Sequence, residues 1–269
     1  MAIRMTVLAS GSRGNCTVLS SDQASILVDA GLSCKETLKR MRAAGEDPHR
    51  LKGIIISHEH QDHVAGLQVL ARKLQIPVYI TEPTYFRWRS DHKDAEGRPA
   101  MLERCEHFQA GSVFSIADIT VTPFTIPHDA ADPCGFTFSS AGIKVGVVTD
   151  LGYLAANVKM HLRACDGLMI ESNHDLEMLR TGPYPWMVKQ RVMSRVGHLS
   201  NAALAEFFAS EYDRKAAFLV LAHLSQENNH PELARQSALE ALGIAVSLFP
   251  SATITLAEQD KPLQPFTLG

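Results

Sequence analysis

The chain has 269 residues, of which 45% are hydrophobic, and a formal net charge of -3. This length suffices for one large domain or two small ones, and the charge balance excludes a globally basic nucleic-acid-binding protein, although not a local basic groove. The five cysteines are scattered and form no C-x-x-C pair, which argues against a disulfide framework or a zinc ribbon. The sequence shows no signal peptide and no apolar run of transmembrane length, so we expect a cytoplasmic protein that does not associate with a membrane.

The first third of the chain alternates short strands and helices. Apolar runs bounded by turn residues predict strands at residues 3–8, 16–20, 25–28, 53–57 and 78–80. Apolar residues at helical spacing predict helices at 35–43 and 62–74. Residues 87–99 are polar, and we predict a surface excursion there.

The rest of the chain begins with a β-rich region and then alternates again. Strands are predicted at residues 119–124, 135–138, 144–149, 167–171, 216–222 and 253–256. Helices are predicted at residues 153–163, 184–196, 201–210 and 231–242. No repeat or linker divides the chain, so we expect a single domain over residues 1–269. The element order predicts an α/β (α+β) protein with two β-sheets packed face to face and helices outside.

A cluster of metal-binding residue types, His58, His60, Asp62 and His63, directly follows the predicted strand at 53–57. On an extended chain His58 and His60 point to the same side, whereas Asp62 and His63 would lie in the first turn of the next helix and could face a second ion. Crowded imidazoles at the end of a buried strand are costly unless something binds them. The motif therefore predicts a divalent metal site, and the alternative is a polar loop with coincidental histidines.

Two ions need more ligands than this motif supplies, and three further residues follow predicted strands. They are His128, Asp150 and His223. A carboxylate after a buried apolar strand is expensive unless it is paired or ligated, although Asp150 could instead cap the following helix. A strand-end histidine such as His223 is by itself usually a satisfied polar group.

With these residues assembled, the pattern resembles the metallo-β-lactamase superfamily, which has a four-layer αββα sandwich and a binuclear site. The motif from His58 to His63 is its signature, and Asp29 matches the acidic residue that braces the metal loop. The resemblance implies that one ion is held by His58, His60, His128 and Asp150. It implies that the other is held by Asp62, His63, His223 and the bridging Asp150.

Further segments are similar to the WalJ/YycJ group, which is related to RNase Z and to the phosphodiesterase PhnP. They are residues 10–15, 171–175, 197–201 and 223–229. This similarity implies a metal-dependent phosphodiesterase, in particular a DNA exonuclease-like nuclease that uses a metal-bridging hydroxide. The alternatives are a small-molecule hydrolase on the same site (a cyclic phosphodiesterase, lactonase or thioesterase) and a non-catalytic module. The intact ligand set argues against the non-catalytic module.

The same resemblance assigns roles to other residues. Asp62 would orient or deprotonate the attacking water, and His198 would stabilise the phosphorane or protonate the leaving oxygen, unless it is a surface histidine. Arg13 and Asn15 could hold a phosphate, or their segment could be only a glycine-rich turn. His174 is expected to support the metal ligands or to cap locally.

The expected cofactors are two divalent ions, zinc or manganese, with iron also compatible. The expected partner is a nucleic acid, DNA rather than RNA, and a homodimer is an open alternative. A phosphate-binding rim is predicted at Arg180, Lys189, Arg191 and Arg195, although most such runs are solvated helix faces. The aromatic residues considered for base stacking are Phe136, Tyr184 and Trp186, with core packing the expected use of at least two.

Overall fold

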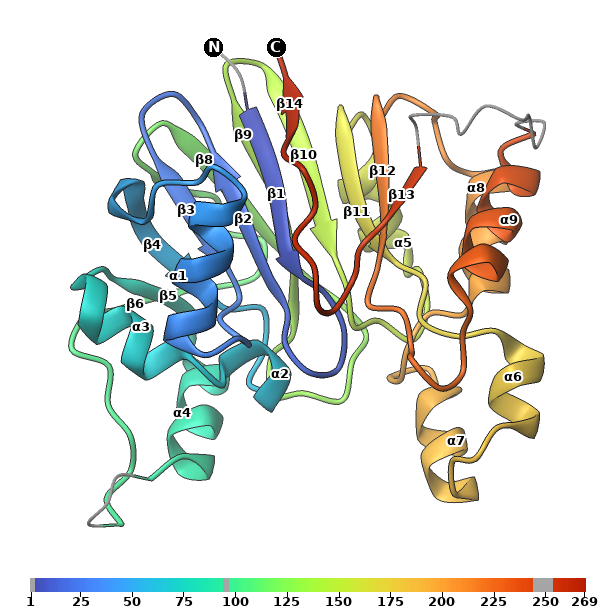
Figure 1. The fold of residues 1–269 in the computed structure, drawn as a ribbon, viewed down its shortest axis with the longest axis horizontal. Helices are drawn as coiled ribbons and strands as arrows, with labels where there is room; N and C mark the ends of the chain where they lie inside the picture. Colours follow the sequence, from blue (N-terminus) through green and yellow to red (C-terminus); the bar gives the residue numbers. More distant parts are fainter. Residues whose placement is uncertain (1–2, 94–96, 244–253) are drawn as a thin grey trace.

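A computed structural model describes residues 3–93, 97–243 and 254–269, and in these residues the strands form two sheets of seven strands each (Figure 1). The first sheet has the order β14 (Phe266–Leu268), β1 (Ile3–Ala9), β2 (Cys16–Ser20), β3 (Ser25–Val28), β4 (Leu51–Ile55), β5 (Val78–Thr81) and β6 (Cys105–Phe108). The second has the order β13 (Ile254–Leu256), β12 (Phe218–Ala222), β11 (Gly167–Glu171), β10 (Ile143–Val148), β9 (Cys134–Ser140), β8 (Ile119–Thr125) and β7 (Phe114–Ile116).

Helices cover the outer faces of the two sheets, and others extend beyond the strand ends at one end of the molecule. Those that follow strands of the first sheet are α1 (Cys34–Ala43), the 3-10 turn η1 (Pro48–Arg50), α2 (Gln61–Val64), α3 (Leu67–Leu74) and α4 (Glu82–Asp91). Those of the second half are α5 (Ala156–Leu162), α6 (Leu176–Thr181), α7 (Trp186–Val192), α8 (Asn201–Ser210) and α9 (Pro231–Ala241). None of the helices in the described part of the chain is long and apolar enough to cross a membrane.

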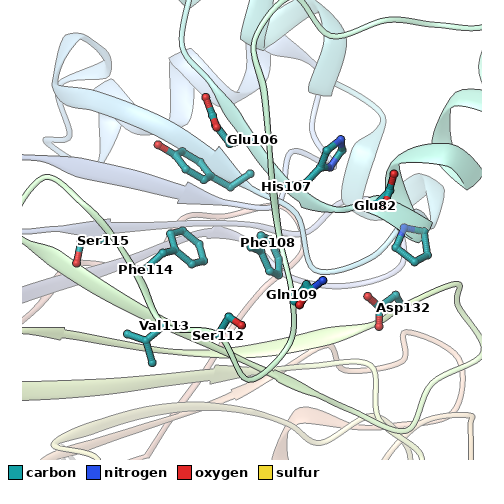
Figure 2. Close-up of a pocket in the computed structure, with 12 residues that line it drawn as sticks. Glu82, Glu106, His107, Phe108, Gln109, Ser112, Val113, Phe114, Ser115 and Asp132 are labelled. Carbon is teal, nitrogen blue, oxygen red and sulfur yellow. The ribbon is translucent and has the colours of Figure 1, made fainter.

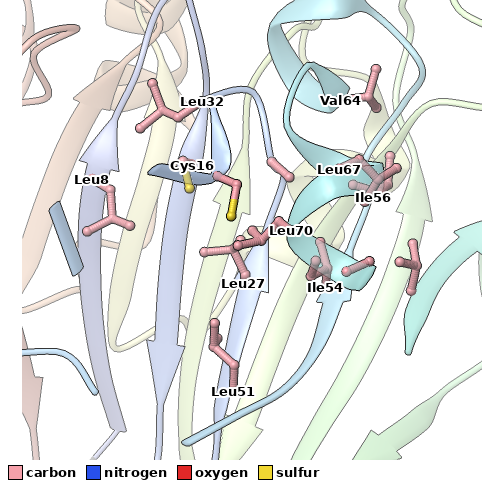
Figure 3. Close-up of a cluster of buried hydrophobic side chains, with 14 of the residues drawn as sticks. Leu8, Cys16, Leu27, Leu32, Leu51, Ile54, Ile56, Val64, Leu67 and Leu70 are labelled. Carbon is pink, nitrogen blue, oxygen red and sulfur yellow. The ribbon is translucent and has the colours of Figure 1, made fainter. Parts of the chain in front are cut away.

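Three apolar cores separate the four layers, and side-chain alternation along the strands sorts residues between them. In β3, Ile26 enters the core between the two sheets and Leu27 enters the core beneath the helices, because successive strand residues point to opposite faces. Figure 3 shows Leu27 and Ile54 of the first sheet beside Leu67 and Leu70 of α3. This arrangement confirms the predicted four-layer αββα sandwich.

Parallel pairing brings the carboxyl ends of several strands to one edge of each sheet. In the second sheet β10, β11 and β12 are parallel neighbours, and in the first sheet β3, β4 and β5 are. Ligands in α/β folds bind beyond the carboxyl ends of such strands, so this topology positions residues that follow β4, β10, β11 and β12 at a common site.

The helix predicted at residues 62–74 is confirmed in part, because most of these residues are helical but form two helices, α2 and α3, separated at Gly66. The Gly66 amide donates to Ala30 O at 2.8 Å, and a Cβ at this position would lie 1.9 Å from Leu32 O. Contact with the loop after β3 therefore breaks the helix, and a pattern of apolar spacing does not report such a contact.

Two other predictions misjudged helix boundaries. Residues 82–91, partly predicted as a surface excursion, form α4, which buries only Thr84 and Trp88 and so shows little apolar periodicity. The helix predicted at 184–196 is only Trp186–Val192, because the His198 amide turns back to donate to Val192 O at 2.9 Å.

Several short elements were not predicted, and one prediction falls partly outside the described residues. The missed elements are η1, β6, β7, α6 and β14. The strand predicted at 253–256 appears as Ile254–Leu256, and Thr253 lies outside the described residues. A further strand, β14, follows it and pairs antiparallel with β1.

Candidate metal centre

All seven predicted metal ligands fall into two groups of potential donor atoms at the carboxyl-end edge of the sheets. The first group contains His58, His60 and His128, and the second contains Asp62, His63, Asp150 and His223. Within each group the donor atoms lie within 4.8 Å of one another. The sharing of Asp150 between two ions stays a prediction, since the structure groups this carboxylate with the second set, and also with Glu171, His198 and His223, but not with the first set.

The first group leaves imidazole nitrogens facing the space between the rings. His58 Nδ1 lies 3.0 Å from Ser57 Oγ, and its buried Nε2 has no hydrogen-bond partner among the described residues. His128 Nδ1 donates to Gly197 O at 3.2 Å, and its Nε2 lies 3.2 Å from His60 Nδ1. Binding of the outer nitrogen by a neighbour fixes the tautomer and leaves the other nitrogen free for a metal.

The second group surrounds one buried carboxylate. Asp150 Oδ2 lies 3.3 Å from His63 Nε2, yet it makes no hydrogen bond among the described residues. The Nε2 atom of His223 is also buried without a hydrogen-bond partner in that part of the chain, and it lies 3.5 Å from Asp62 Oδ2. Imidazole nitrogens and carboxylate oxygens in this number suit a divalent metal ion, so the residues present fit the implied cofactor.

Charge within the site differs between the two groups. Burial lowers the pKa of the His58 imidazole well below its ordinary value, and the neighbouring His63 adds to this effect. Burial also acts to lower the pKa of His63, but the Asp150, Asp29 and Asp62 carboxylates outweigh it and raise that pKa well above its ordinary value. His58 thus keeps its lone pairs free of protons, and the carboxylates of the second group attract positive charge, as metal ligands do.

The loop that carries the motif is held by Asp29, as the resemblance implied. Asp29 accepts from the Ser57 amide at 2.8 Å and from His63 Nδ1 at 2.7 Å. Asp29, Asp150 and His223 adopt left-handed backbone conformations with φ values of 61°, 60° and 53°. Non-glycine residues rarely adopt this region, and they cluster at functional sites.

Asn15 positions Asp62. Its side-chain amide donates to Asp62 Oδ2 at 3.1 Å, and its backbone amide donates to Asp62 O at 2.7 Å. The approach of the two loops is close, because a Cβ on Gly31 would lie 1.7 Å from Asp62 O and 2.6 Å from Asn15 N. The segment at residues 10–15 is therefore more than a turn, because it fixes one of the candidate ligands.

The other supporting residues have different surroundings. Arg13 is exposed and pairs with Asp260 at 2.7 Å, so it belongs to neither ligand group. His174 is buried with Nδ1 unpaired among the described residues, and burial lowers its pKa to about 4. It does not cap α6, because Asp175 does so. Likewise, Asp150 caps no helix, since Ala155 occupies the N-cap of α5.

His198 lies beside both ligand groups and is oriented by Glu171, a functional residue that the sequence prediction missed. The His198 ring centroid lies 5.3 Å from that of His128 and 5.2 Å from that of His223. Glu171 Oε1 accepts from Nδ1 of His198 at 2.8 Å and from Nδ1 of His223 at 2.9 Å. The signal that could have identified Glu171 is the one used for Asp150, a carboxylate at the end of a buried strand.

Glu171 also changes the charge state of His198. Burial lowers the pKa of His198, but the Glu171 carboxylate outweighs burial and raises it above its ordinary value. A histidine with this environment keeps its proton at higher pH and can donate it to a leaving oxygen.

The four basic residues predicted to form a phosphate-binding rim each have a different partner in the structure. Arg180 pairs with Glu177 at 2.7 Å, and Lys189 is buried with Nζ donating to Arg180 O at 2.8 Å. Arg195 lies over the Tyr153 ring, 4.2 Å from its centroid. Arg191 alone of the four makes its side-chain ion pair with a residue adjacent to the ligand groups, Asp129.

The three aromatic residues also differ. Phe136 is part of the core between the sheets. Tyr184 is half-buried and lines a cavity of about 90 Å³ with His198 and His223. Trp186 is 63% exposed, so at least this side chain is not used for core packing.

A larger cavity lies elsewhere in the fold. It has a volume of about 690 Å³ and is lined by residues of β5, β6, β7 and α4, including Glu106, Phe108 and Phe114 (Figure 2). None of the described residues that line it belongs to a candidate metal-binding group. We therefore assign the chemistry to the histidine and aspartate cluster and not to this larger space.

Comparisons with known proteins agree with this geometry. The family model of the beta-lactamase superfamily domain matches residues 24–224. The chain is 39% identical over 242 residues to exodeoxyribonuclease YycJ of Bacillus anthracis, covering 90% of both chains. It is 35% identical over 245 residues to exodeoxyribonuclease WalJ of Streptococcus pneumoniae, covering 91% of this chain and 90% of that protein.

A solved structure shows the same fold at low sequence identity. The metallo-β-lactamase fold protein YhfI from Bacillus subtilis superposes with a TM-score of 0.69 at 17% identity, covering 97% of this chain and 99% of that one. The family match and the two relatives together show that the chain belongs to the metallo-β-lactamase superfamily, in the group of YycJ/WalJ-like proteins.

Proposed function

We propose that this protein is a metal-dependent phosphodiesterase that acts as an exonuclease on DNA. One observation carries the proposal: His58 Nε2 in the first ligand group, and Asp150 Oδ2 and His223 Nε2 in the second, are buried without hydrogen-bond partners among the described residues. Unpaired buried polar atoms are costly, and a divalent ion at each ligand group would satisfy them. The curated relatives YycJ and WalJ, named exodeoxyribonucleases, support DNA as the substrate.

Each ligand group would hold one divalent ion, so the proposal includes two ions, with zinc or manganese preferred and iron compatible. When bound, such ions lower the pKa of water and neutralise charge on phosphate oxygens. Asp62, held by Asn15, would orient the attacking water or accept its proton. His198, held by Glu171, would donate a proton to the leaving oxygen. His174 and Asp29 would support the metal ligands.

The proposal also includes a reducing cellular compartment and a DNA strand as partner, and it allows either a monomer or a homodimer. All five cysteines are unpaired, and unpaired cysteines are typical of the cytoplasm. We propose that residues 1–269 form a single domain. The homodimer is the alternative to a monomer, and size-exclusion chromatography with light scattering measures this oligomeric state directly.

The test of the function combines metal analysis with a substrate panel. Purified protein is assayed for zinc, manganese and iron, and then incubated with single-stranded DNA and RNA oligonucleotides labelled at the 5′ or the 3′ end. Stepwise shortening of DNA from one end is the expected result. Hydrolysis of ester, lactone or cyclic phosphodiester substrates with no oligonucleotide cleavage would contradict the nuclease and favour the small-molecule hydrolase.

A further inference from the structure

Arg191 joins α7 to the loop that carries His128. Its Nε donates to Asp129 Oδ2 at 2.5 Å and its Nη2 donates to Asp129 Oδ1 at 3.1 Å, across 62 positions of sequence. Asp129 follows His128 directly, and its Oδ1 lies 3.5 Å from His128 Nε2. The Asp129 amide also donates to Val196 O at 3.0 Å. These contacts fix the guanidinium beside the first ligand group.

Arg191 lies among negative charges. Its hydrogen bond to the Asp129 carboxylate raises the pKa of Arg191, burial opposes this rise, and the charges of Asp129 and Asp62 add to it. Asp62 is one of the candidate metal ligands. Because Asp129 also contacts the imidazole of His128, the guanidinium that it holds lies near the first ligand group, where a phosphate would bind the ions.

The Arg191–Asp129 ion pair is exposed enough for Arg191 to exchange Asp129 for another anion. The Arg191 side chain is 56% exposed and that of Asp129 is 29% exposed. Ion pairs exposed to this degree contribute little to stability, so exchanging one anion for another costs little. A guanidinium presents two parallel N–H donors, which fit the two oxygens of a phosphate as well as those of a carboxylate.

A pocket of about 480 Å³ lies next to the first ligand group and to Asp129. It is lined by His60, Gln61 and Asp129, and by Arg87 and His92 of the α4 region. Figure 1 shows α4 and α7 projecting at the same end of the molecule, on opposite sides of α2. A strand that leaves the ligand groups through this pocket would pass Asp129, the residue that holds Arg191.

We propose that Arg191 binds a phosphate of the substrate strand, and that Asp129 holds the guanidinium in position until the substrate replaces it. This inference rests on the proposed nuclease function and names the residue that recognises the strand. It also assigns opposite effects to the two partners. Loss of Arg191 weakens substrate binding, whereas neutralising Asp129 removes the competing anion and strengthens it.

The neighbouring pair Arg180–Glu177 provides a matched control, because it has the same charges but is bound to neither ligand group. The variants Arg191→Gln, Asp129→Asn, Arg180→Gln and Glu177→Gln are assayed for KM with a labelled single-stranded oligonucleotide over a range of salt concentrations. Metal content and melting temperature verify that each variant is folded and loaded.

Arg191→Gln is expected to raise KM about tenfold and to reduce the slope of log(kcat/KM) against log[salt] by about 0.7, the value for one lost phosphate contact on a single strand. Asp129→Asn is expected to lower KM. A KM for Arg191→Gln equal to that of Arg180→Gln overturns the assignment of Arg191, and a metal-loaded Asp129→Asn protein with a raised KM overturns the role of Asp129. If the parental protein neither binds nor cleaves oligonucleotides, the proposed function itself fails, and the inference fails with it.

Discussion

Asp29, Asp150 and Glu171 are carboxylates buried at strand ends, yet their hydrogen bonding differs. Asp29 accepts from Ser57 and His63, and Glu171 accepts from two backbone amides and from two imidazoles. Asp150 keeps one oxygen unpaired in the described structure. A carboxylate with all its partners positions its neighbours, whereas one with a free buried oxygen needs a cation. Carboxylates at similar positions therefore serve two purposes, the positioning of neighbouring side chains and the binding of a cation.

Asp150→Asn tests this difference. The neutral amide cannot neutralise a cation, so the variant should lose metal and should lose more than about 100-fold in phosphodiesterase activity. Metal content per chain and bis-p-nitrophenyl phosphate hydrolysis are measured. Asp166→Asn, at the opposite end of β11, is the control and should keep its metal. A fully loaded and active Asp150→Asn protein would show that this carboxylate is not a ligand.

His198→Ala separates proton transfer from metal binding. The variant should keep its metal content but lose a factor of ~10²–10⁴ in kcat, a typical loss for a general acid. His49→Ala, which removes an exposed imidazole from η1, is the matched control. If His198→Ala turns over at the parental rate, the proton donor is another group. If it loses metal, His198 acts as a ligand with Asp150 and Glu171, which lie in the same donor group.

Among the elements, the junction between α1 and the first sheet depends on a buried carboxylate away from the metal centre. Glu46 follows α1 and accepts from Arg4 at two positions of 2.9 Å, from Thr6 at 2.7 Å and from Ser20 at 3.0 Å. Burial acts to raise the pKa of Glu46, but the hydrogen bonds from Arg4 and Thr6 outweigh it and lower that pKa. The Glu46 side chain thus connects the end of α1 to β1 and β2 by hydrogen bonds.

The depressed pKa makes this junction sensitive to acid. The stabilisation is present above the unfolded-state pKa, for which the ordinary value is 4.5, and is lost as pH falls through the folded-state value. Glu46→Gln should lower the free energy of unfolding at pH 7 by about 1.5–3 kcal/mol, as for a hydrogen-bonded charged group. Urea titrations at pH 7 and pH 3 measure this difference, which should shrink at pH 3. A constant difference at both pH values would contradict the ionised state of Glu46.

In the whole molecule, the metal centre lies at the seam between the two sheets. The first sheet supplies His58, His60, Asp62 and His63, and the second supplies His128, Asp150 and His223. Ions at this seam would therefore add a connection between two layers that also meet in the apolar core between them. Binding to the native state alone stabilises it in proportion to the logarithm of ligand concentration over Kd.

Removal of metal should consequently destabilise the entire protein. At an ion concentration about 1,000 times Kd, chelation removes ~4 kcal/mol, which for a chain of this size lowers Tm by about 10 °C. Differential scanning calorimetry with and without a chelator measures the shift, and metal added back should reverse it. Asp150→Asn should have a smaller shift than the parental protein. A chelator-insensitive Tm in a protein shown to contain metal would mean that the ions do not link the sheets.

Local sequence patterns predicted most elements but not where contacts between distant segments interrupt them. Apolar runs correctly predicted the strands at 16–20, 25–28 and 167–171, because a buried strand is a run of consecutive apolar residues in the sequence. The helix predicted at 62–74 is interrupted because Gly66 packs against the loop at residues 30–32. The polar sequence of α4 concealed a helix whose single large buried residue is Trp88.

By itself, the sequence determined the fold class and the candidate ligands, because strand periodicity and the spacing of the histidine motif are local properties. Only the tertiary structure decided that Glu171 orients His198 and His223, that Asn15 holds Asp62, and that Arg191 is the basic residue paired at the centre. The physical reason is distance along the chain. Arg191 and Asp129 are 62 positions apart, and their contact exists only once the sheets have packed and the strand ends have met.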